Sequence, residues 1–128
     1  MNRIHHVGVA VEDLAAARAV WDALLAEEPE TEEVPTQRVR AAMYPCGVEL
    51  IAPTSPESPI SKFLAKRGPG IHHITIEVAD LDAELARLRS QRTPLINEQA
   101  VRGAGGSRIA FLHPSAADGV LVELKERK

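Results

Sequence analysis

The sequence predicts an α+β fold made of two tandem copies of one βαβββ module. The first observation is an internal repeat, because IHHVGVAVEDL at residues 4–14 returns as IHHITIEVADL at residues 71–81. The second is a later match in the same order, since residues 48–50 and 122–124 both read Val-Glu-Leu. The third is a stretch with helical spacing of apolar residues after each copy of the first motif. Self-similarity of this kind indicates a duplicated structural unit.

The first module begins with a strand. Residues 4–11 alternate in polarity and are rich in branched side chains, which is typical of a strand. Asp13 can cap the helix that follows, and Pro29 marks the end of that helix. Three further strands are then expected near residues 32–34, 39–44 and 48–52.

The second module repeats this order. A strand is expected at residues 71–78, and Asp80 can cap a helix that continues to about Gln91. Three strands should follow near residues 95–97, 108–112 and 120–125.

A short helix separates the two modules. Ser58 with Pro59 can open this helix, and Gly68 can close it. We therefore expect a single domain of residues 1–128. Its parts are module one at about 1–55, the linker helix at about 58–68 and module two at about 70–128.

The composition is that of a globular protein. Apolar residues make up 45% of the 128 residues, and the net charge of −3 argues against a nucleic-acid surface, which needs clustered positive charge. No apolar run approaches the roughly 20 residues of a membrane span. The first residues lack the features of a signal peptide, and Cys46 is the only cysteine. We therefore expect a cytoplasmic protein that binds neither nucleic acid nor membrane.

Strand parity separates the paired histidines. Side chains alternate between the two faces of a strand. His5 and His72 fall on faces that are rich in branched residues, and such faces should pack under the helices. His6 and His73 fall on faces with small and polar residues, which can line a cavity.

Glu49 and Glu123 hold equivalent positions of the repeat, each inside an apolar stretch. A charged residue in such a strand is costly unless it is paired or binds a metal. With His6 and His73 they make a set of two histidines and two carboxylates, which suits a divalent ion with open positions for water and substrate. We expect one ion per chain, with Co, Mn, Ni, Zn and Fe(II) as candidates.

The sequence also resembles the vicinal oxygen chelate superfamily, which includes glyoxalase I, extradiol dioxygenases and bleomycin-resistance proteins. The resemblance is carried by IHHVGVAVEDL, EVPTQRVRAAMYP, VELIAPTSPESPISKFLAKRGPGIHHITIEV and GGSRIAFLHPSAADGVLVEL. Within the superfamily, the chain is similar over nearly its whole length to the methylmalonyl-CoA epimerase family. The stretch SPISKFLAKRGPGIHHI is the most specific, because the bare metal pattern occurs across the superfamily.

The resemblance implies a cupped mixed sheet around the metal and, usually, a homodimer. It matches the family's four metal ligands to His6, Glu49, His73 and Glu123. The implied activity interconverts (2R)- and (2S)-methylmalonyl-CoA by C2 proton abstraction through a metal-stabilised enolate, so the partner would be a small acyl-CoA substrate. We expect Glu123 to act as the principal base and Glu49 as its partner.

One position departs from the family pattern. Some members carry a glutamate, proposed as a catalytic base, where the segment PTQRVRA has Ala41. The second base of the usual scheme is then missing or supplied from elsewhere. Gln37 matches the family's glutamine in the same segment, where a cavity contact and a loop hydrogen bond are both open explanations.

Other interpretations stay open. A glyoxalase I-type isomerase acting on a glutathione hemithioacetal would use the same site, although SPISKFLAKRG argues against it. A non-catalytic ligand-binding protein, as in bleomycin resistance, often lacks a full metal set, whereas this chain has all four residues. Lys62, Lys66 and Arg67 form a basic cluster beside the linker helix, and it can serve either to attract an anionic CoA tail or simply as a solvated helix face.

Overall fold

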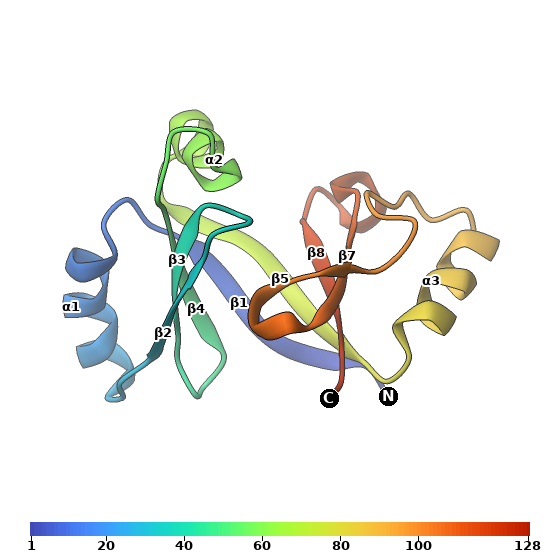
Figure 1. Cartoon of the computed structure of the whole chain (residues 1–128), viewed down its shortest axis with the longest axis horizontal. Coiled ribbons are helices and arrows are strands. Elements are labelled where there is room, and N and C mark those ends of the chain that lie inside the picture. The colour runs from blue at the N-terminus through green and yellow to red at the C-terminus, as the bar shows by residue number, and fades with distance from the viewer. The chain divides into compact units, whose positions relative to one another are not determined.

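The computed structural model describes all 128 residues and confirms the α+β class, with eight strands in a mixed sheet and three α-helices. The chain divides into two compact units. We call His6–His72 the N-terminal unit, and Met1–His5 together with His73–Lys128 the C-terminal unit (Figure 1). The single domain stays a prediction. The assignment of the first five residues to the C-terminal unit was not predicted.

The N-terminal unit contains most of the first module and the linker helix. Its elements are β1 (Arg3–Ala10, from His6 onward), α1 (Leu14–Leu25), β2 (Glu30–Val34), β3 (Val39–Met43), β4 (Val48–Pro53) and α2 (Pro59–Arg67). The strand order is β2-β3-β4-β1. β1 is parallel to β4, and β3 is antiparallel to both of its neighbours.

The C-terminal unit repeats this arrangement. Its elements are β5 (Gly70–Val78, from His73 onward), α3 (Leu81–Ser90), β6 (Val101–Arg102), β7 (Arg108–Leu112) and β8 (Val122–Glu126), with two short 3-10 turns at Ala104–Gly106 and Pro114–Ala117. The strand order is β5-β8-β7-β6, with β5 parallel to β8 and β7 antiparallel to β8 and β6. The duplicated strand pairing therefore follows the duplicated sequence.

One expected strand is wrong. Residues 95–97 make only an isolated bridge, from Leu95 to Leu112, and the edge strand is the two-residue β6. Asn97 shows why this ladder stops. Its side-chain Oδ1 accepts the backbone N–H of Phe111 at 2.8 Å, a position that a backbone carbonyl would take in a continuing ladder.

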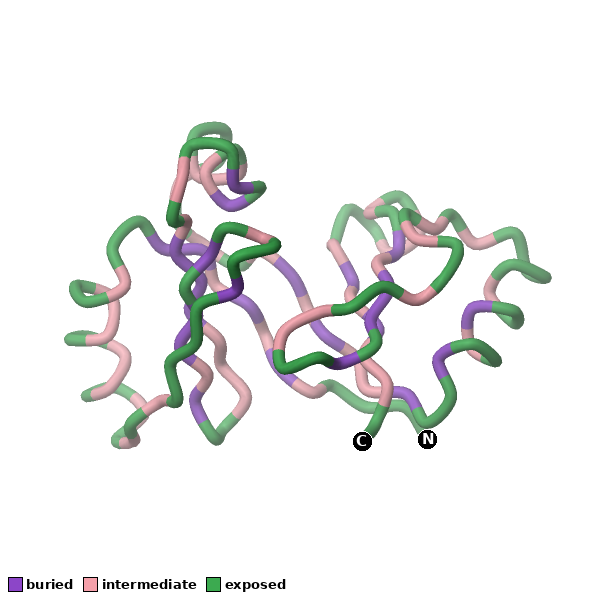
Figure 2. Tube along the Cα trace, viewed as in Figure 1, coloured by how far each residue is buried: buried purple, intermediate pink, exposed green.

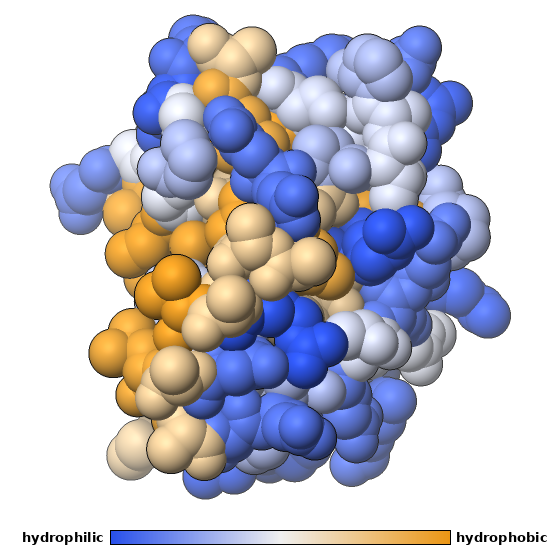
Figure 3. Space-filling model, turned by 90° about the vertical axis from the view of Figure 1, so that its left-hand side faces the viewer, coloured by the Kyte–Doolittle hydropathy of each residue, from blue (hydrophilic) through white to orange (hydrophobic).

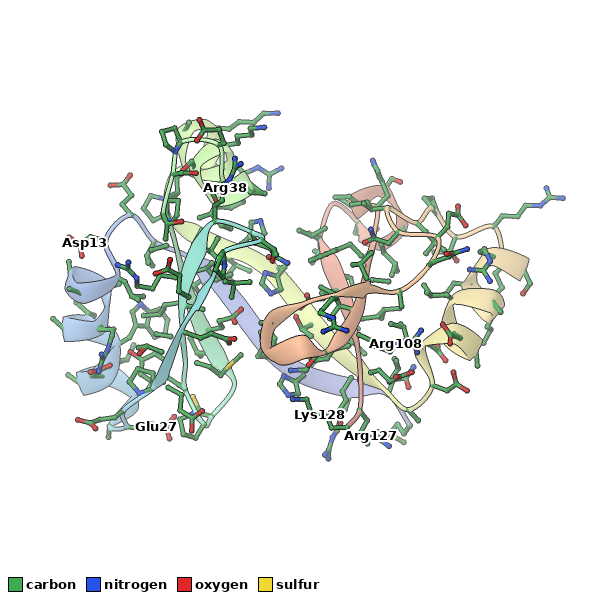
Figure 4. All side chains as sticks on the ribbon, viewed as in Figure 1. Asp13, Glu27, Arg38, Arg108, Arg127 and Lys128 are labelled. Atoms are coloured by element: carbon green, nitrogen blue, oxygen red, sulfur yellow. The ribbon has the colours of Figure 1, made fainter.

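The two long helices begin in the same way. Oδ1 of Asp13 accepts the backbone N–H of Ala16 at 3.1 Å, and Oδ1 of Asp80 accepts that of Ala83 at 3.0 Å. Each cap satisfies a donor that the first helical turn leaves open, as predicted. Asp13 is labelled at the start of α1 in Figure 4. The caps lie just after β1 and β5, so each helix begins within a few residues of the end of its strand.

Each unit has its own apolar core between its helix and one face of its strands. In the N-terminal unit α1 packs against a cluster that includes Val11 and Leu50. In the C-terminal unit α3 packs against a cluster that includes Val78 and Leu124. Buried residues, drawn in purple, lie along strands of both units in Figure 2. The branched faces of β1 and β5 therefore meet the helices, which confirms the parity argument. His6 of β1 and His73 of β5 lie on the opposite strand faces.

The outer side of α1 keeps some apolar surface. Val20 and Leu24 are exposed there, and Figure 3 looks onto this side, where apolar side chains gather over α1. No helix of the structure has both the length and the apolar character that crossing a membrane requires.

A polar contact also ties α1 to its strands. Tyr44 follows β3, and its Oη donates to Oδ1 of Asp22 in α1 at 2.5 Å. Arg18 donates to the other carboxylate oxygen at 3.0 Å. Burial, helped by the hydrogen bond to Asp22, raises the pKa of the Tyr44 phenol to about 12. The bonds from Tyr44 and Arg18 lower the pKa of the Asp22 carboxyl.

We expect this contact to fail at alkaline pH. A phenol with a raised folded pKa stabilises the fold fully below its unfolded pKa, roughly 10, and that stabilisation is lost as the pH rises toward about 12. Tyr44 is the only tyrosine, so tyrosinate absorbance reports on it alone. Its midpoint should lie near 12 in the folded protein. Thermal stability should fall more steeply above pH 10 in the wild type than in Tyr44→Phe. An ordinary titration of folded protein near pH 10 would contradict the contact.

Candidate metal centre

In the N-terminal unit, His6 and Glu49 lie beside each other on β1 and β4. The strands are parallel and Gly8 pairs with Glu49, so His6 lies two residues earlier on the face of Gly8. Nε2 of His6 is 3.3 Å from Oε1 of Glu49, and the side chains are 5% and 13% exposed. The pair is therefore largely shielded from water.

In the C-terminal unit, His73 and Glu123 repeat this arrangement on β5 and β8. Thr75 pairs with Glu123, and His73 again lies two residues earlier on the same face. Nε2 of His73 is 3.9 Å from Oε1 of Glu123, and the side chains are 7% and 13% exposed. The repeat thus builds the same histidine–glutamate pair twice.

Thr75 adds a contact that the sequence analysis missed. It is fully buried, and its hydroxyl donates to Oε1 of Glu123 at 2.5 Å. Strand parity puts Thr75 on the face of His73, but it does not reveal the cross-strand partner. Only the register of β5 with β8 reveals this partner, because it places Thr75 opposite Glu123.

His72, the neighbour of His73 in the sequence, packs against α2. The His72 ring meets the Phe63 ring of α2 edge to face, with centroids 5.0 Å apart. Burial lowers the pKa of His72, and the negative charge of Glu49 acts in the opposite direction. This helix is α2, the linker helix. His5 lies half-buried at the equivalent position of β1.

Ala41 lies on the glutamate face of the N-terminal unit. Across the antiparallel ladders it pairs with Ile51 of β4 and with Glu32 of β2, and two residues further Met43 pairs with Glu49. Ala41 is buried and brings no titratable group to this face. Directly opposite residues of an antiparallel pair share a face, so Glu32 is the carboxylate next to Ala41 across the β2–β3 ladder.

Gln37 lies in the turn between β2 and β3. Its backbone N–H donates to the carbonyl of Val34 at 3.1 Å, and its backbone carbonyl accepts the Ser58 hydroxyl at 3.3 Å. Ser58 also caps α2. Both bonds use backbone atoms of Gln37, so neither distinguishes between a cavity contact and a loop hydrogen bond for its side chain.

The donors of the two pairs fit a divalent metal. Imidazole nitrogen and carboxylate oxygen are both ligands of such ions. Metal–ligand bonds of about 2.0–2.2 Å place two neighbouring ligands of one ion about 3–3.5 Å apart. The 3.3 Å between His6 and Glu49 lies in this range, and the 3.9 Å between His73 and Glu123 is slightly longer. Each unit therefore carries a pair that suits half of a metal site.

Similarity to known proteins extends over nearly the whole chain. Residues 5–111 match the family described as the Glyoxalase/Bleomycin resistance protein/Dioxygenase superfamily. The mitochondrial methylmalonyl-CoA epimerase of Bos taurus is 38% identical over 131 residues, which cover 98% of this chain and 75% of that protein. The crystal structure of methylmalonyl-CoA epimerase from Mycobacterium tuberculosis is 43% identical with a TM-score of 0.89, covering 98% of this chain and 87% of that one. A solved methylmalonyl-CoA epimerase in complex with methylmalonyl-CoA and NH4+ is 38% identical with a TM-score of 0.88, covering 98% and 94%.

Proposed function

Because the chain belongs to the glyoxalase/bleomycin resistance protein/dioxygenase superfamily and, within it, to the methylmalonyl-CoA epimerase family, we propose that it interconverts (2R)- and (2S)-methylmalonyl-CoA. It is then an epimerase, an isomerase acting on an acyl-CoA thioester. The observation that carries the proposal is the duplicated His–Glu pair on the strand faces opposite the helices. The substrate class comes from the relatives, one of which was solved with methylmalonyl-CoA bound.

We propose that His6, Glu49, His73 and Glu123 together hold one divalent ion, with Co, Mn, Ni, Zn and Fe(II) as candidates. Support comes from the donor types, from the two short His–Glu separations and from the low exposure of all four side chains. When bound, such an ion supplies a Lewis acid for the thioester and carboxylate oxygens of the substrate.

The protein's own carboxylates would move the proton. C2 of methylmalonyl-CoA lies between a thioester carbonyl and a carboxylate, so its C–H bond is weakly acidic. Inversion requires that the proton leave one face of C2 and that a proton return to the other face. We assign the first base to Glu123 and the second to Glu49, since Ala41 supplies none. Positioned acid–base groups of this kind contribute about 10²–10⁴-fold each to a rate.

The test is solvent exchange at C2. Metal-loaded protein is incubated with each epimer separately in D₂O, and proton NMR follows both the C2 signal and the appearance of the other epimer. We expect exchange and inversion from either epimer, and neither after the metal has been removed by chelation. A fully metal-loaded protein without exchange from either epimer would remove the epimerase proposal. The glyoxalase I-type isomerase and the ligand-binding protein would then be tested next.

Positive charge on α2 gives a separate expectation for the CoA tail. Lys62, Lys66 and Arg67 are exposed on this helix, and the Arg67 guanidinium lies 5.8 Å from the centre of the Phe63 ring. Lys62→Glu with Lys66→Glu reverses two charges and leaves the Arg67 contact in place. If α2 attracts the anionic tail, KM should rise several-fold at low salt with kcat unchanged, and the effect should shrink as salt is added.

The matched control reverses two exposed charges elsewhere, Arg92→Glu with Lys128→Glu in the C-terminal unit. It changes the net charge by the same amount and should leave KM nearly unchanged. A low-salt KM of the α2 variant that equals the wild-type value would show that α2 is only a solvated helix face.

A further inference from the structure

We propose that the Thr75 hydroxyl is a positioning group that gives the two carboxylate oxygens of Glu123 different tasks. Thr75 holds Oε1 on the metal side, and Oε2 is then the oxygen that meets the C2 proton. This inference rests on the proposed metal site and epimerase reaction. It adds to them a residue that acts through Glu123 and that the metal ligand pattern does not contain.

Two contacts identify Oε1 as the metal-side oxygen. Oε1 accepts the Thr75 hydroxyl at 2.5 Å, and the same atom is the one that lies 3.9 Å from Nε2 of His73. Thr75 and Glu123 are in register across the parallel strands β5 and β8. The hydroxyl therefore comes from a position that the backbone pairing fixes.

The burial of Thr75 makes this contact rigid. The residue is fully buried on the face of β5 that carries His73. A threonine side chain has few rotamers because it is branched at Cβ. A hydrogen bond to an ionised carboxylate is also stronger than one between neutral groups. Rotation of the Glu123 carboxylate would break this bond, so Thr75 restrains which oxygen faces His73.

This restraint acts on geometry and not on basicity. If Thr75 holds one oxygen on the metal side, the other can approach the substrate without the carboxylate leaving its place. Outer-shell hydrogen bonds commonly orient metal-binding side chains in this way, and their removal typically weakens metal affinity by about 10–100-fold.

The repeat offers an internal comparison. In the N-terminal unit the residue in register with Glu49 is Gly8, which has no side chain and so cannot donate a hydroxyl from that position. The two His–Glu pairs therefore share their strand register, and at the position in register with the glutamate β5 offers a hydroxyl where β1 has a glycine.

Three substitutions separate the hydroxyl from the packing of the side chain. Thr75→Ser and Thr75→Ala both lack the threonine methyl group, so they share any packing defect and differ only in the hydroxyl. Thr75→Val keeps the threonine shape and lacks the hydroxyl. Thr31→Ala removes the hydroxyl of an exposed threonine on β2 and serves as the control.

The first readout is affinity for Zn²⁺ and Co²⁺, measured by competition with a chelator in the absence of substrate. We expect Thr75→Ala and Thr75→Val to bind about 10–100-fold more weakly than the wild type. Thr75→Ser and Thr31→Ala should stay within about threefold of the wild type, well short of that loss. Equal affinities of the serine and alanine variants would overturn the proposal. Circular dichroism of the metal-free proteins checks folding, and the Ser–Ala comparison stands even if the valine variant does not fold.

The second readout is catalysis at saturating metal. Thr75→Ala should lower kcat and leave KM nearly unchanged, and Thr75→Ser should restore kcat. If the wild type shows no exchange at C2 from either epimer, the proposed function fails. The affinity difference between Thr75→Ala and Thr75→Ser would still decide whether Thr75 positions Glu123.

Discussion

Replacement of His6 or His73 by alanine should abolish metal binding, whereas replacement of His5 or His72 should leave one ion per chain. His6 and His73 each place Nε2 within 4 Å of a carboxylate oxygen on the strand face opposite the helices. His72 instead packs against the Phe63 ring of α2, and its loss removes an aromatic contact. Its substitution should therefore lower the thermal midpoint of the metal-free protein by several degrees.

Metal content after equilibrium dialysis against Zn²⁺ or Co²⁺ shows directly which of the histidine variants bind the ion. All four alanine variants are measured together with the wild type, and metal-free thermal unfolding shows which of them are destabilised. His5→Ala is the matched control for His6→Ala, because the two residues are adjacent in β1 and differ in the strand face they occupy. If His5→Ala and His72→Ala lost the ion while the other two variants kept it, the assignment of faces would be reversed.

Glu123→Gln and Glu49→Gln should each lose C2 proton exchange from one epimer of methylmalonyl-CoA, and the two variants should lose it from opposite epimers. Glutamine keeps the volume and one oxygen donor of glutamate but removes the basic carboxylate. If Glu123 and Glu49 act on opposite faces of C2, each variant loses exchange from the epimer whose proton faces the missing base. That loss should be about 10²–10⁴-fold. Each variant should retain exchange from the other epimer, but neither should invert the substrate.

Proton NMR in D₂O, with each epimer supplied separately, distinguishes the two variants, and metal analysis confirms that both keep the ion. Glu32→Gln is the control, because Glu32 lies next to Ala41 across the β2–β3 ladder and outside the proposed ligand set. It should exchange and invert like the wild type. If Glu32→Gln lost exchange from one epimer while Glu49→Gln remained normal, the second base would be Glu32. If Glu123→Gln exchanged both epimers at the wild-type rate, Glu123 would not be a base.

The sequence was sufficient to predict which strand faces carry the proposed metal ligands. The repeat located both His–Glu pairs, and alternation along β1 and β5 separated His6 and His73 from their neighbours, because the core clusters require the branched faces to meet the helices. Features that depend on partners distant in the sequence could not be predicted. The contact between Thr75 and Glu123 depends on the register of β5 with β8.

Dependence on a distant partner also explains why the strand predicted at residues 95–97 is wrong. The composition of this segment suits a strand, but the Asn97 side chain accepts the backbone N–H of Phe111, and the ladder ends after an isolated bridge. Whether an asparagine bonds its own loop or a neighbouring strand depends on where that strand lies. Local pattern therefore predicted the type of most elements and failed where one side chain competed with the backbone.

Residues Met1–His5 contact partners in the C-terminal unit, which the ribosome synthesises much later. Asn2 donates to Glu84 across 82 residues of chain, and Nε of Arg3 lies 3.8 Å from Glu77. At about 5–20 residues per second, a ribosome leaves this segment without those partners for several seconds, while the N-terminal unit can already begin to fold. Closing so long a loop costs only slightly more entropy than closing a short one, so the delay is mainly one of time. Asn2 and Arg3 are polar and charged, and such side chains discourage a waiting strand from pairing with another chain.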